Sequence, residues 1–226
     1  MSKLRRASVE DAVGIYELEK RVWGKTGATQ EMINSRLSVF PEGAYVATEG
    51  PKIIGVVFFE IIDSKKSYKT WYDYTDNGLI QKSHKSDGDK IFGIDLSVSD
   101  EFTGQGTGTN LLLTVADYSI KHGLKGGFLG GRMPLYYKHK NMAPGDYIKY
   151  RDDKGRLVDP ELRFYTRAGL EIAKVLPNYF EDPQSNNYGV LLEWANPFYN
   201  IKNRTARSIA AFAFRVGFKI NLAISR

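Results

Sequence analysis

A strand-like run, three alternating glycines and a helix-like run follow one another in the middle of the chain. The run 91–98 enters the glycine segment 104–108, and the helical pattern 110–122 leaves it. Glycine lets the backbone approach a ligand closely because no Cβ intervenes. The first amides of a helix have no intrahelical partner and lie at the positive end of its dipole. This junction therefore predicts a backbone site for an anion, most often a phosphate.

Two common phosphate-binding patterns do not describe the junction. No Gly-Lys-Ser/Thr follows the glycines, so the segment is not a P-loop. A dinucleotide-binding loop places its last glycine three residues after the second, whereas Gly108 follows Gly106 by two. A glycine-rich turn that binds nothing is the remaining alternative.

The rest of the chain predicts a sheet with helices around it. Apolar periodicity and turn residues divide the chain into alternating elements. We expect strands at 3–6, 43–49, 52–62, 91–98, 126–133, 170–176 and 188–194, and helices at 9–23, after Thr29, at 110–122 and at 159–168. The run 52–62 is apolar on both faces, so we expect a central, covered strand there.

The two glycine positions resemble the coenzyme A signature of the GNAT N-acetyltransferase superfamily, Gln/Arg-x-x-Gly-x-Gly/Ala. Gly106 and Gly108 occupy them. A second segment, 164–170, reads Phe-Tyr-Thr-Arg-Ala-Gly-Leu and is similar to the family's Tyr-x-x-x-Gly-Phe. The sequence departs from the family pattern at Thr103, where Arg or Gln is usual, and at Asp100, where Pro is usual.

The resemblance covers about residues 3–194 and implies an α/β (α+β) GNAT fold. That fold has a mixed, mostly antiparallel sheet, splayed at the fourth and fifth strands and flanked by helices. We expect a GNAT domain at 1–194 and a basic helical tail at 195–226. The segments 130–137, 176–180 and 191–194 also resemble a GNAT subgroup that is sometimes fused to a nitrilase-like amidase domain.

The resemblance implies an N-acetyltransferase that moves acetyl from acetyl-CoA to a small or amino-acid-like amine by direct attack. A coenzyme A sensor or interaction module without turnover is the alternative. In the family the pantetheine lies between the splayed strands and the diphosphate lies on the glycine loop. The implied cofactor contacts are Leu96, Ser97, Val98, Thr103, Gly104, Gln105, Gly106, Thr107, Gly108 and Thr109.

Tyr165 matches the family tyrosine that protonates the leaving thiolate. A phenol of pKa about 10 suits that transfer, although a packing role is the alternative. The base that takes the amine proton is open. Asp95 reaches the site only if a bulge turns it inward, because strict alternation places it on the face opposite Ile94 and Val98. Glu60 is a second candidate, and a water chain is a third.

Aromatic and basic side chains suggest where the acceptor binds. The loop 68–74 and the segment after the fifth expected strand are the candidate walls, and 139–158 adds an extra connection there. An arginine among tyrosines suits an acceptor with a carboxylate and an apolar surface, although surface and packing roles are equally open. The candidate substrate residues are Trp71, Tyr72, His84, Arg132, Tyr136 and Tyr137.

The net charge of +6 comes from the tail. Six of the 32 basic residues lie in 195–226, which has no acidic residue, and the preceding segment has 26 of each sign. Apolar residues at helical spacing within 205–220 predict a basic amphipathic helix. We expect it to dock on its own domain or on a second subunit in a homodimer, with a membrane surface or nucleic acid as the less favoured partner.

Composition limits the other function classes. The chain has no cysteine, so thiolate metal sites and disulfides are excluded. The three histidines have no recognised ligand spacing, and we expect no metal. No apolar run reaches the ~18 residues that span a membrane. The amino-terminal segment lacks a secretory apolar region, and we expect a cytoplasmic protein.

Overall fold

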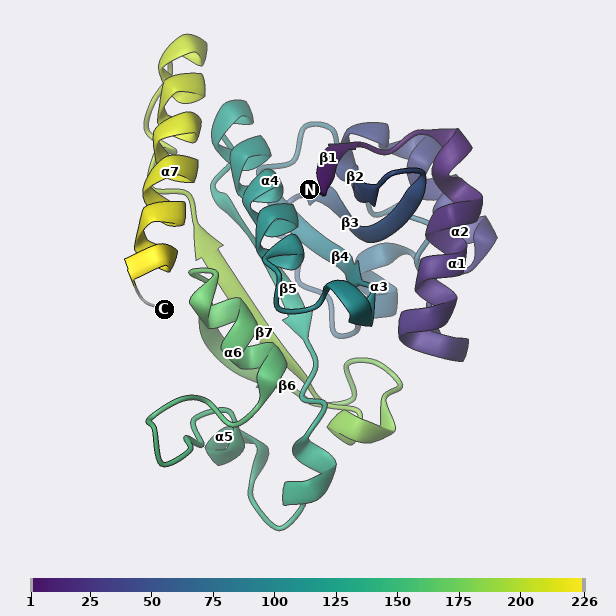
Figure 1. Ribbon diagram of the computed structural model, residues 1–226, viewed down its shortest axis with the longest axis vertical. Helices are drawn as coiled ribbons and strands as arrows, with labels where there is room; N and C mark the ends of the chain where they lie inside the picture. Colours follow the sequence, from purple (N-terminus) through teal and green to yellow (C-terminus); the bar gives the residue numbers. More distant parts are fainter. Residues whose placement is uncertain (1, 225–226) are drawn as a thin grey trace.

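The computed structural model describes the backbone of residues 2–224 and the side chains up to residue 220. Arg226, one of the six basic tail residues, lies outside this part. A seven-stranded sheet runs through it in the order β1-β2-β3-β4-β5-β7-β6 (Figure 1). Every neighbouring pair is antiparallel except β4 and β5. The predicted mixed, mostly antiparallel sheet is confirmed.

The strands and helices predicted from the sequence appear in the predicted order, and α3 is an additional short helix in the expected loop 68–74. The strands are β1 (Lys3–Arg6), β2 (Ala44–Glu49), β3 (Lys52–Ile62), β4 (Lys90–Val98), β5 (Gly126–Gly131), β6 (Glu171–Leu176) and β7 (Gly189–Ala195). The helices are α1 (Ala12–Trp23), α2 (Gln30–Val39), α3 (Trp71–Thr75), α4 (Thr107–His122), α5 (Pro144–Tyr147), α6 (Pro160–Arg167) and α7 (Arg204–Ile224).

Side-chain caps explain where several helices begin. Thr29 accepts a hydrogen bond from the Met32 amide at the start of α2. Asp159 accepts from the Glu161 and Leu162 amides at the start of α6, directly before Pro160. These caps place the first turns of both helices within a residue or two of the positions that the sequence predicts.

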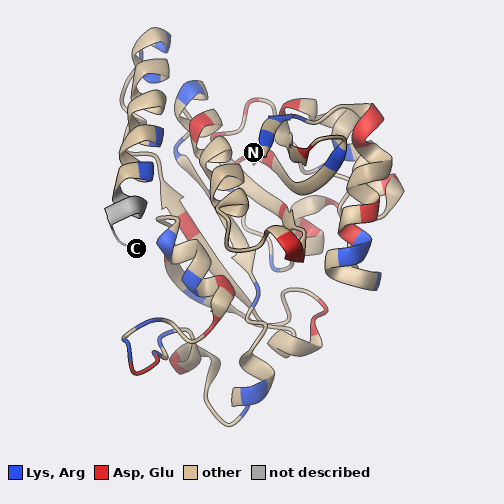
Figure 2. Ribbon diagram, in the orientation of Figure 1, with Lys and Arg blue, Asp and Glu red and all other residues tan. Residues whose placement is uncertain are grey.

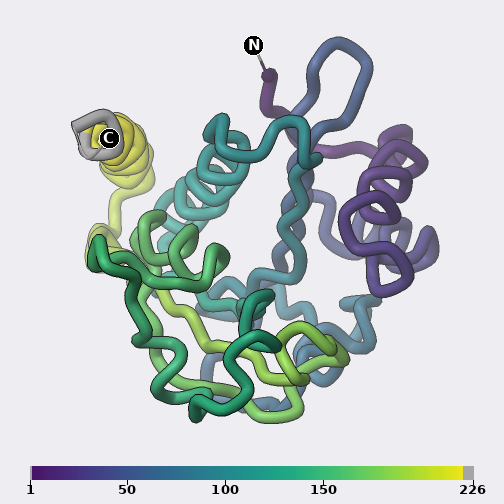
Figure 3. Tube along the Cα trace, turned by 60° about the horizontal axis from the view of Figure 1, so that its bottom comes forward, coloured from purple at the N-terminus to yellow at the C-terminus, as the bar shows by residue number. Residues whose placement is uncertain are grey.

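Helices cover both faces of the sheet (Figures 1 and 3). On one face, Tyr74 of α3 stacks on Phe92 of β4, with 4.7 Å between ring centroids. On the other, a Cβ built on Gly55 of β3 would meet Leu111 of α4 at 3.1 Å. β3 is buried along nearly its whole length between these layers, as its apolar sequence predicts.

Strands β4 and β5 share only three residue pairs. These are Ile91 with Gly127, Phe92 with Phe128, and Gly93 with Leu129. Beyond Gly93, β4 stays paired with β3 alone, and β5 stays paired with β7. The expected divergence at the fourth and fifth strands is therefore present, and it opens the sheet next to the first turn of α4.

Helix α7 lies beside α4 (Figures 1 and 3). Ala210 and Ala211 are buried against it, and the Arg215 guanidinium donates to the Leu113 carbonyl at 3.4 Å. The outer face of α7 exposes four apolar side chains, Ile209, Phe212, Val216 and Ile220, near the basic residues that Figure 2 shows along this helix. No helix of the described part is long and apolar enough to cross a membrane.

Candidate active site

The glycine loop leaves the first turn of α4 without a side-chain cap. Gly106 is the N-cap residue, with φ +86°. That left-handed conformation favours glycine, and glycine has no side chain that could accept from the following amides. The amides of the first turn, from Thr107 to Thr109, thus have no capping side chain, and the positive end of the helix dipole lies at the open edge of β4.

The helix begins three residues before the predicted start. Thr107, Gly108 and Thr109 therefore belong to α4, whereas Thr103, Gly104 and Gln105 form the turn before it. Gly108 lies against α6, because a Cβ there would meet Phe164 at 3.2 Å. The two segments that carry the sequence resemblance therefore contact each other.

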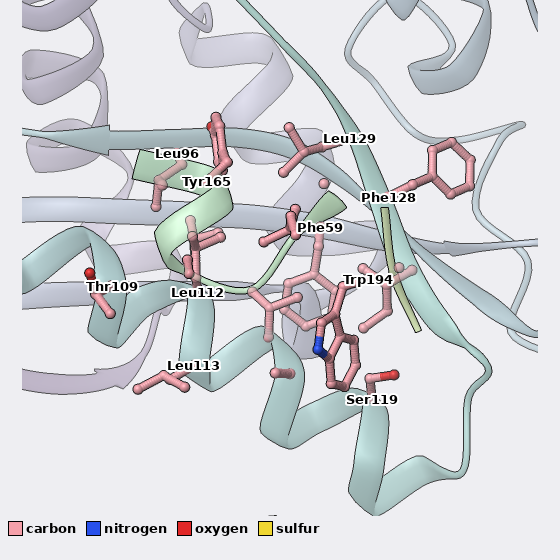
Figure 4. Close-up of a pocket in the computed structure, with 18 of the residues that line it drawn as sticks. Phe59, Leu96, Thr109, Leu112, Leu113, Ser119, Phe128, Leu129, Tyr165 and Trp194 are labelled. Atoms are coloured by element: carbon pink, nitrogen blue, oxygen red, sulfur yellow. The ribbon is translucent and has the colours of Figure 1, made fainter. Parts of the chain in front are cut away.

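A cavity lies on the α4 face of the sheet at the divergence of β4 and β5 (Figure 4). Leu96 of β4, Leu129 of β5 and Tyr165 of α6 line one end of it. The α4 wall comes from one helix face, with Thr109, Leu112, Ala116 and Ser119 at helical spacing. Its lining is mostly apolar, so the cavity suits an elongated ligand with a polar end at the first turn of α4.

Tyr165 keeps its proton at neutral pH. Burial raises the pKa of the Tyr165 phenol, and the nearby carboxylates of Glu161 and Asp95 raise it further. Glu161 lies one helical turn before Tyr165, and burial raises the pKa of Glu161 to about 7 although Arg132 lowers it. A protonated phenol at the end of an apolar cavity can donate a proton to an anion formed there.

Asp95 faces α2. The register of β3 and β4 shifts between Phe58 and Phe59, where Asp95 pairs with Phe58 and Gly93 with Phe59. The sequence analysis left open whether β4 has a bulge near Asp95. The structure has one, with Ile94 as the extra residue. The Asp95 carboxylate makes an ion pair with the Arg36 guanidinium, which is 1% exposed. Asp95 also contributes to the cavity lining, and its carboxylate is already neutralised by an arginine.

A chain of hydrogen bonds runs next to this ion pair. The Trp23 indole donates to the Ser97 hydroxyl at 2.6 Å, and that hydroxyl donates to the Glu19 carboxylate at 2.6 Å. Burial raises the pKa of Glu19 to about 7, and the charge of Asp95 raises it as well. Glu19 can therefore exchange a proton near neutral pH, through Ser97.

Arg132 is held by acidic partners. Its guanidinium donates twice to Asp182, at 2.8 and 3.0 Å, and once to Gln184 at 2.8 Å. The guanidinium also lies over the Trp23 ring, 4.9 Å from the centroid. This bidentate geometry fixes the loop before β7 next to the α1 end, and it occupies the Nε and Nη2 donors of the guanidinium.

The other candidate substrate residues do not gather in one place. Trp71 lies at the bulge, where its indole donates to the Ile94 carbonyl at 3.2 Å. Tyr72 and Tyr137 are exposed. Tyr136 is buried and its hydroxyl donates to the Met142 carbonyl at 2.8 Å, so it packs in the core of the 133–162 segment.

His84 and Glu60 lie outside the cavity lining. The His84 ring stacks on Phe40, with 4.3 Å between centroids, and burial lowers its pKa. Glu60 is fully buried and neither carboxyl oxygen has a hydrogen-bond partner among the described residues. Burial raises the pKa of Glu60 to about 8. Neither group lines the cavity.

Three charged residues at the site were not predicted. Glu19 and Arg36 are buried on the inner faces of α1 and α2, and Glu161 lies in the first turn of α6. The signal for Glu19 was present, because it neighbours Leu18 in the buried stripe of its helix. Among the described residues, no group of three His, Cys, Asp or Glu side chains is placed to hold a metal.

A sequence profile described as the Acetyltransferase (GNAT) family matches residues 12–135, which is more than half of the chain. The chain belongs to the GNAT acetyltransferase family. The match covers the glycine loop, the whole of α4 and both strands that diverge at the cavity. The acyltransferase class predicted from the sequence is thereby confirmed.

A relative in sequence and two solved structures of similar fold accompany this assignment. The uncharacterized N-acetyltransferase YkwB of Bacillus subtilis is 37% identical over 175 residues, which is 76% of each chain. The loading GNATL domain of CurA from Lyngbya majuscula superposes with a TM-score of 0.77 at 25% identity, covering 87% of this chain and 98% of that domain. The GNAT-like decarboxylase GphF, solved with isobutyryl-CoA, has a TM-score of 0.74 at 21% identity, covering 86% and 99%.

Proposed function

We propose that this GNAT protein transfers an acetyl group from acetyl-CoA to the amine of a small or amino-acid-like acceptor by direct attack. The observation that carries the proposal is the uncapped first turn of α4, which faces the open edge of β4 beside an apolar cavity. The amides of Gly106 to Thr109 would bind the coenzyme A diphosphate, with backbone contacts from the preceding turn, Thr103 to Gln105. Thr103 supplies no positive charge, so main-chain amides would bind the diphosphate.

The pantetheine arm would lie between β4 and α4. Leu96 of β4 lines the cavity there, Ser97 and Val98 follow it in the strand, and Leu112 and Tyr165 close the apolar side. Backbone amides of β4 would polarise the thioester carbonyl oxygen and stabilise the negative charge that develops on it. This arrangement holds the thioester at the divergence of the strands, where an amine can approach from the α1 and α3 face.

Proton transfers complete the reaction. The neutral amine nitrogen attacks the carbonyl carbon, and the carbon–sulfur bond breaks as the amide forms. The Tyr165 phenol donates its proton to the departing thiolate. Glu161, with a pKa of about 7, is the neighbouring group that can return a proton to Tyr165.

The amine must lose a proton, and Glu19 fits this role better than Asp95. Asp95 is paired with Arg36, whereas the pKa of Glu19 is raised to about 7 and its carboxylate accepts from Ser97. We propose that the amine proton passes through water and the Ser97 hydroxyl to Glu19. Asp95 then has a positioning role, because its ion pair with Arg36 joins α2 to β4 beside Ser97.

The acceptor would lie against Trp23 and Trp71, the two indoles next to this chain of hydrogen bonds. Tyr72 and Tyr137 are exposed and stay candidate contacts, whereas Arg132, Tyr136 and His84 have structural partners. The resemblance to nitrilase-linked GNAT proteins, a homodimer and a cytoplasmic location all stay predictions from the sequence.

A coenzyme A sensor without turnover is the second candidate, and the neutralised Asp95 favours it. Two measurements separate the possibilities. A ligand that binds only the native protein raises its melting temperature, so acetyl-CoA must do so in either case. Thiol release with a panel of amino acids, polyamines and short peptides then identifies an enzyme. Binding without release for every amine would support the sensor, and no binding would overturn both.

A further inference from the structure

The cavity continues past the point where β4 and β5 diverge. Its far end lies beneath α4, beside the paired part of the two strands, and its lining there consists of Ile91, Gly127, Ser119, Trp194 and Phe214. The thioester of an acetyl group would end near Leu96 and Tyr165, several residues along β4 from this end. Acetyl therefore leaves the far half of the cavity empty.

The strand side of the far half is open because two neighbouring residues have no side chains. Gly93 and Gly127 lie on adjacent strands and both line the cavity. A Cβ on Gly93 would meet Leu129 at 3.1 Å, and one on Gly127 would meet Ile91 at 3.1 Å. A side chain at either position would narrow the passage between the near and far halves.

The side chains that α4 turns toward the cavity also become smaller with depth. Along the cavity-facing side of α4, Leu112 is followed by Ala116 and then Ser119. Phe214 of α7 closes the far end against Trp194, with 5.7 Å between ring centroids. Asp95 is the one charged residue in the described lining, and it lies at the near end. The far half is therefore mostly apolar, and the Ser119 hydroxyl, which is buried without a hydrogen-bond partner among the described residues, is the polar exception.

We propose that the far half of this cavity binds the alkyl part of an acyl-CoA whose acyl chain is longer than acetyl. This proposal rests on the proposed function, because it assumes that coenzyme A occupies the near half. The carboxyl-terminal helix then sets the chain length that fits, through Phe214 and Phe218. The transfer reaction stays the same, with the longer acyl group moving to the amine.

A series of thioesters with the same carrier tests the proposal. Calorimetry would measure the dissociation constants of coenzyme A, acetyl-CoA, butyryl-CoA, hexanoyl-CoA and octanoyl-CoA without an acceptor. Each buried methylene gives about fourfold tighter binding, so we expect butyryl-CoA to bind at least tenfold more tightly than acetyl-CoA. Equal or weaker binding of butyryl-CoA and hexanoyl-CoA would overturn the proposal. No binding of any member, coenzyme A included, would overturn the proposed function itself.

Two matched variants test whether the acyl chain lies in the far half of the cavity. Ala116→Leu fills the passage, so it should abolish the gain from acetyl-CoA to hexanoyl-CoA and leave the affinity for coenzyme A within about threefold of wild type. Ala213→Leu makes the same change on the exposed face of α7 and should leave the whole series unchanged. An Ala116→Leu protein that keeps the full chain-length gain would contradict the proposal.

A third variant tests whether the acyl chain lies in the far half if Ala116→Leu does not fold. Phe214→Ala enlarges the far end, so the tightest member of the series should move to a longer chain. An unchanged preference in a folded Phe214→Ala protein would place the chain elsewhere and overturn the assignment.

Discussion

Gly93 pairs with Leu129 in the last residue pair that β4 and β5 share. Beyond this pair the strands separate, and Tyr165 from α6 and Leu96 from β4 line the space that opens. The position of this single pair therefore sets where a thioester would meet an amine, and the predictions below concern the groups around it.

Replacing Tyr165 by phenylalanine removes the proposed acid and keeps the ring. Because general acid catalysis contributes about 10²–10⁴-fold, we expect Tyr165→Phe to lower kcat by about a hundredfold or more. The dissociation constant of acetyl-CoA should change little, since the hydroxyl acts on the thiolate. Thiol-release kinetics and calorimetry measure the two quantities. Wild-type kcat in this variant would remove Tyr165 from the mechanism.

Gly106→Ala should weaken coenzyme A binding. Its φ of +86° costs an alanine about 1–2 kcal/mol, so the loop relaxes and its amides lose their alignment. Gly155→Ala is the control, because Gly155 has φ +72° and open space around it, in a turn remote from the cavity. Both variants should melt at a lower temperature, but only Gly106→Ala should raise the dissociation constant. An equal effect of both on affinity would speak against the loop as the diphosphate site.

Glu60 should make the protein less stable as pH rises. Its folded pKa of about 8 lies above the ordinary value of 4.5, mainly because of burial, with Arg36, Asp76 and Lys85 as the nearby charges. A carboxyl group with a raised folded pKa contributes stability at low pH that is lost as pH rises toward the folded pKa. Stability should therefore fall between about pH 5 and pH 9.

Glu60→Gln tests this assignment directly. The amide cannot ionise, so the variant should lose less of its melting temperature than wild type between pH 5 and pH 9. Glu19, with a pKa of about 7, contributes in the same direction and keeps part of the slope. Thermal denaturation across this range measures both slopes, and identical slopes would show that Glu60 does not titrate there.

Arg132 should matter for stability more than for substrate affinity. Removing one partner of a largely buried ion pair leaves the other charge uncompensated, at a cost of about 3 kcal/mol. Arg132→Ala should destabilise the protein by about that much, because Asp182 is only 10% exposed. Asp182→Asn in the Arg132→Ala background should recover part of the loss. Denaturant titration of the single and double variants measures the coupling, and additive losses would contradict it.

The order of elements was predictable because each depends on local signals. The apolar run of β3, the cap at Asp159 and the glycines before α4 are all short-range features of the sequence. Tyr165 also follows from a local segment, since its helix has a clear beginning and end. The prediction that β4 and β5 diverge came from the family resemblance and not from a local signal.

The charged part of the site was less predictable because it depends on pairing across the fold. Arg36 and Asp95 are far apart in the sequence and form an ion pair between α2 and β4. The sequence neighbours of Arg132 suggested that its guanidinium binds a substrate carboxylate. In the structure, two nitrogens of that guanidinium donate to Asp182 instead. No local pattern in the sequence reveals such long-range partners.

The most direct test compares coenzyme A with pantetheine, which lacks the diphosphate and the nucleotide. Calorimetry at low and moderate salt would measure both dissociation constants. If the uncapped amides of α4 grip the diphosphate, coenzyme A binds at micromolar concentration and pantetheine at least a hundredfold more weakly. Equal affinities, or no heat with coenzyme A at millimolar concentration, would contradict the account.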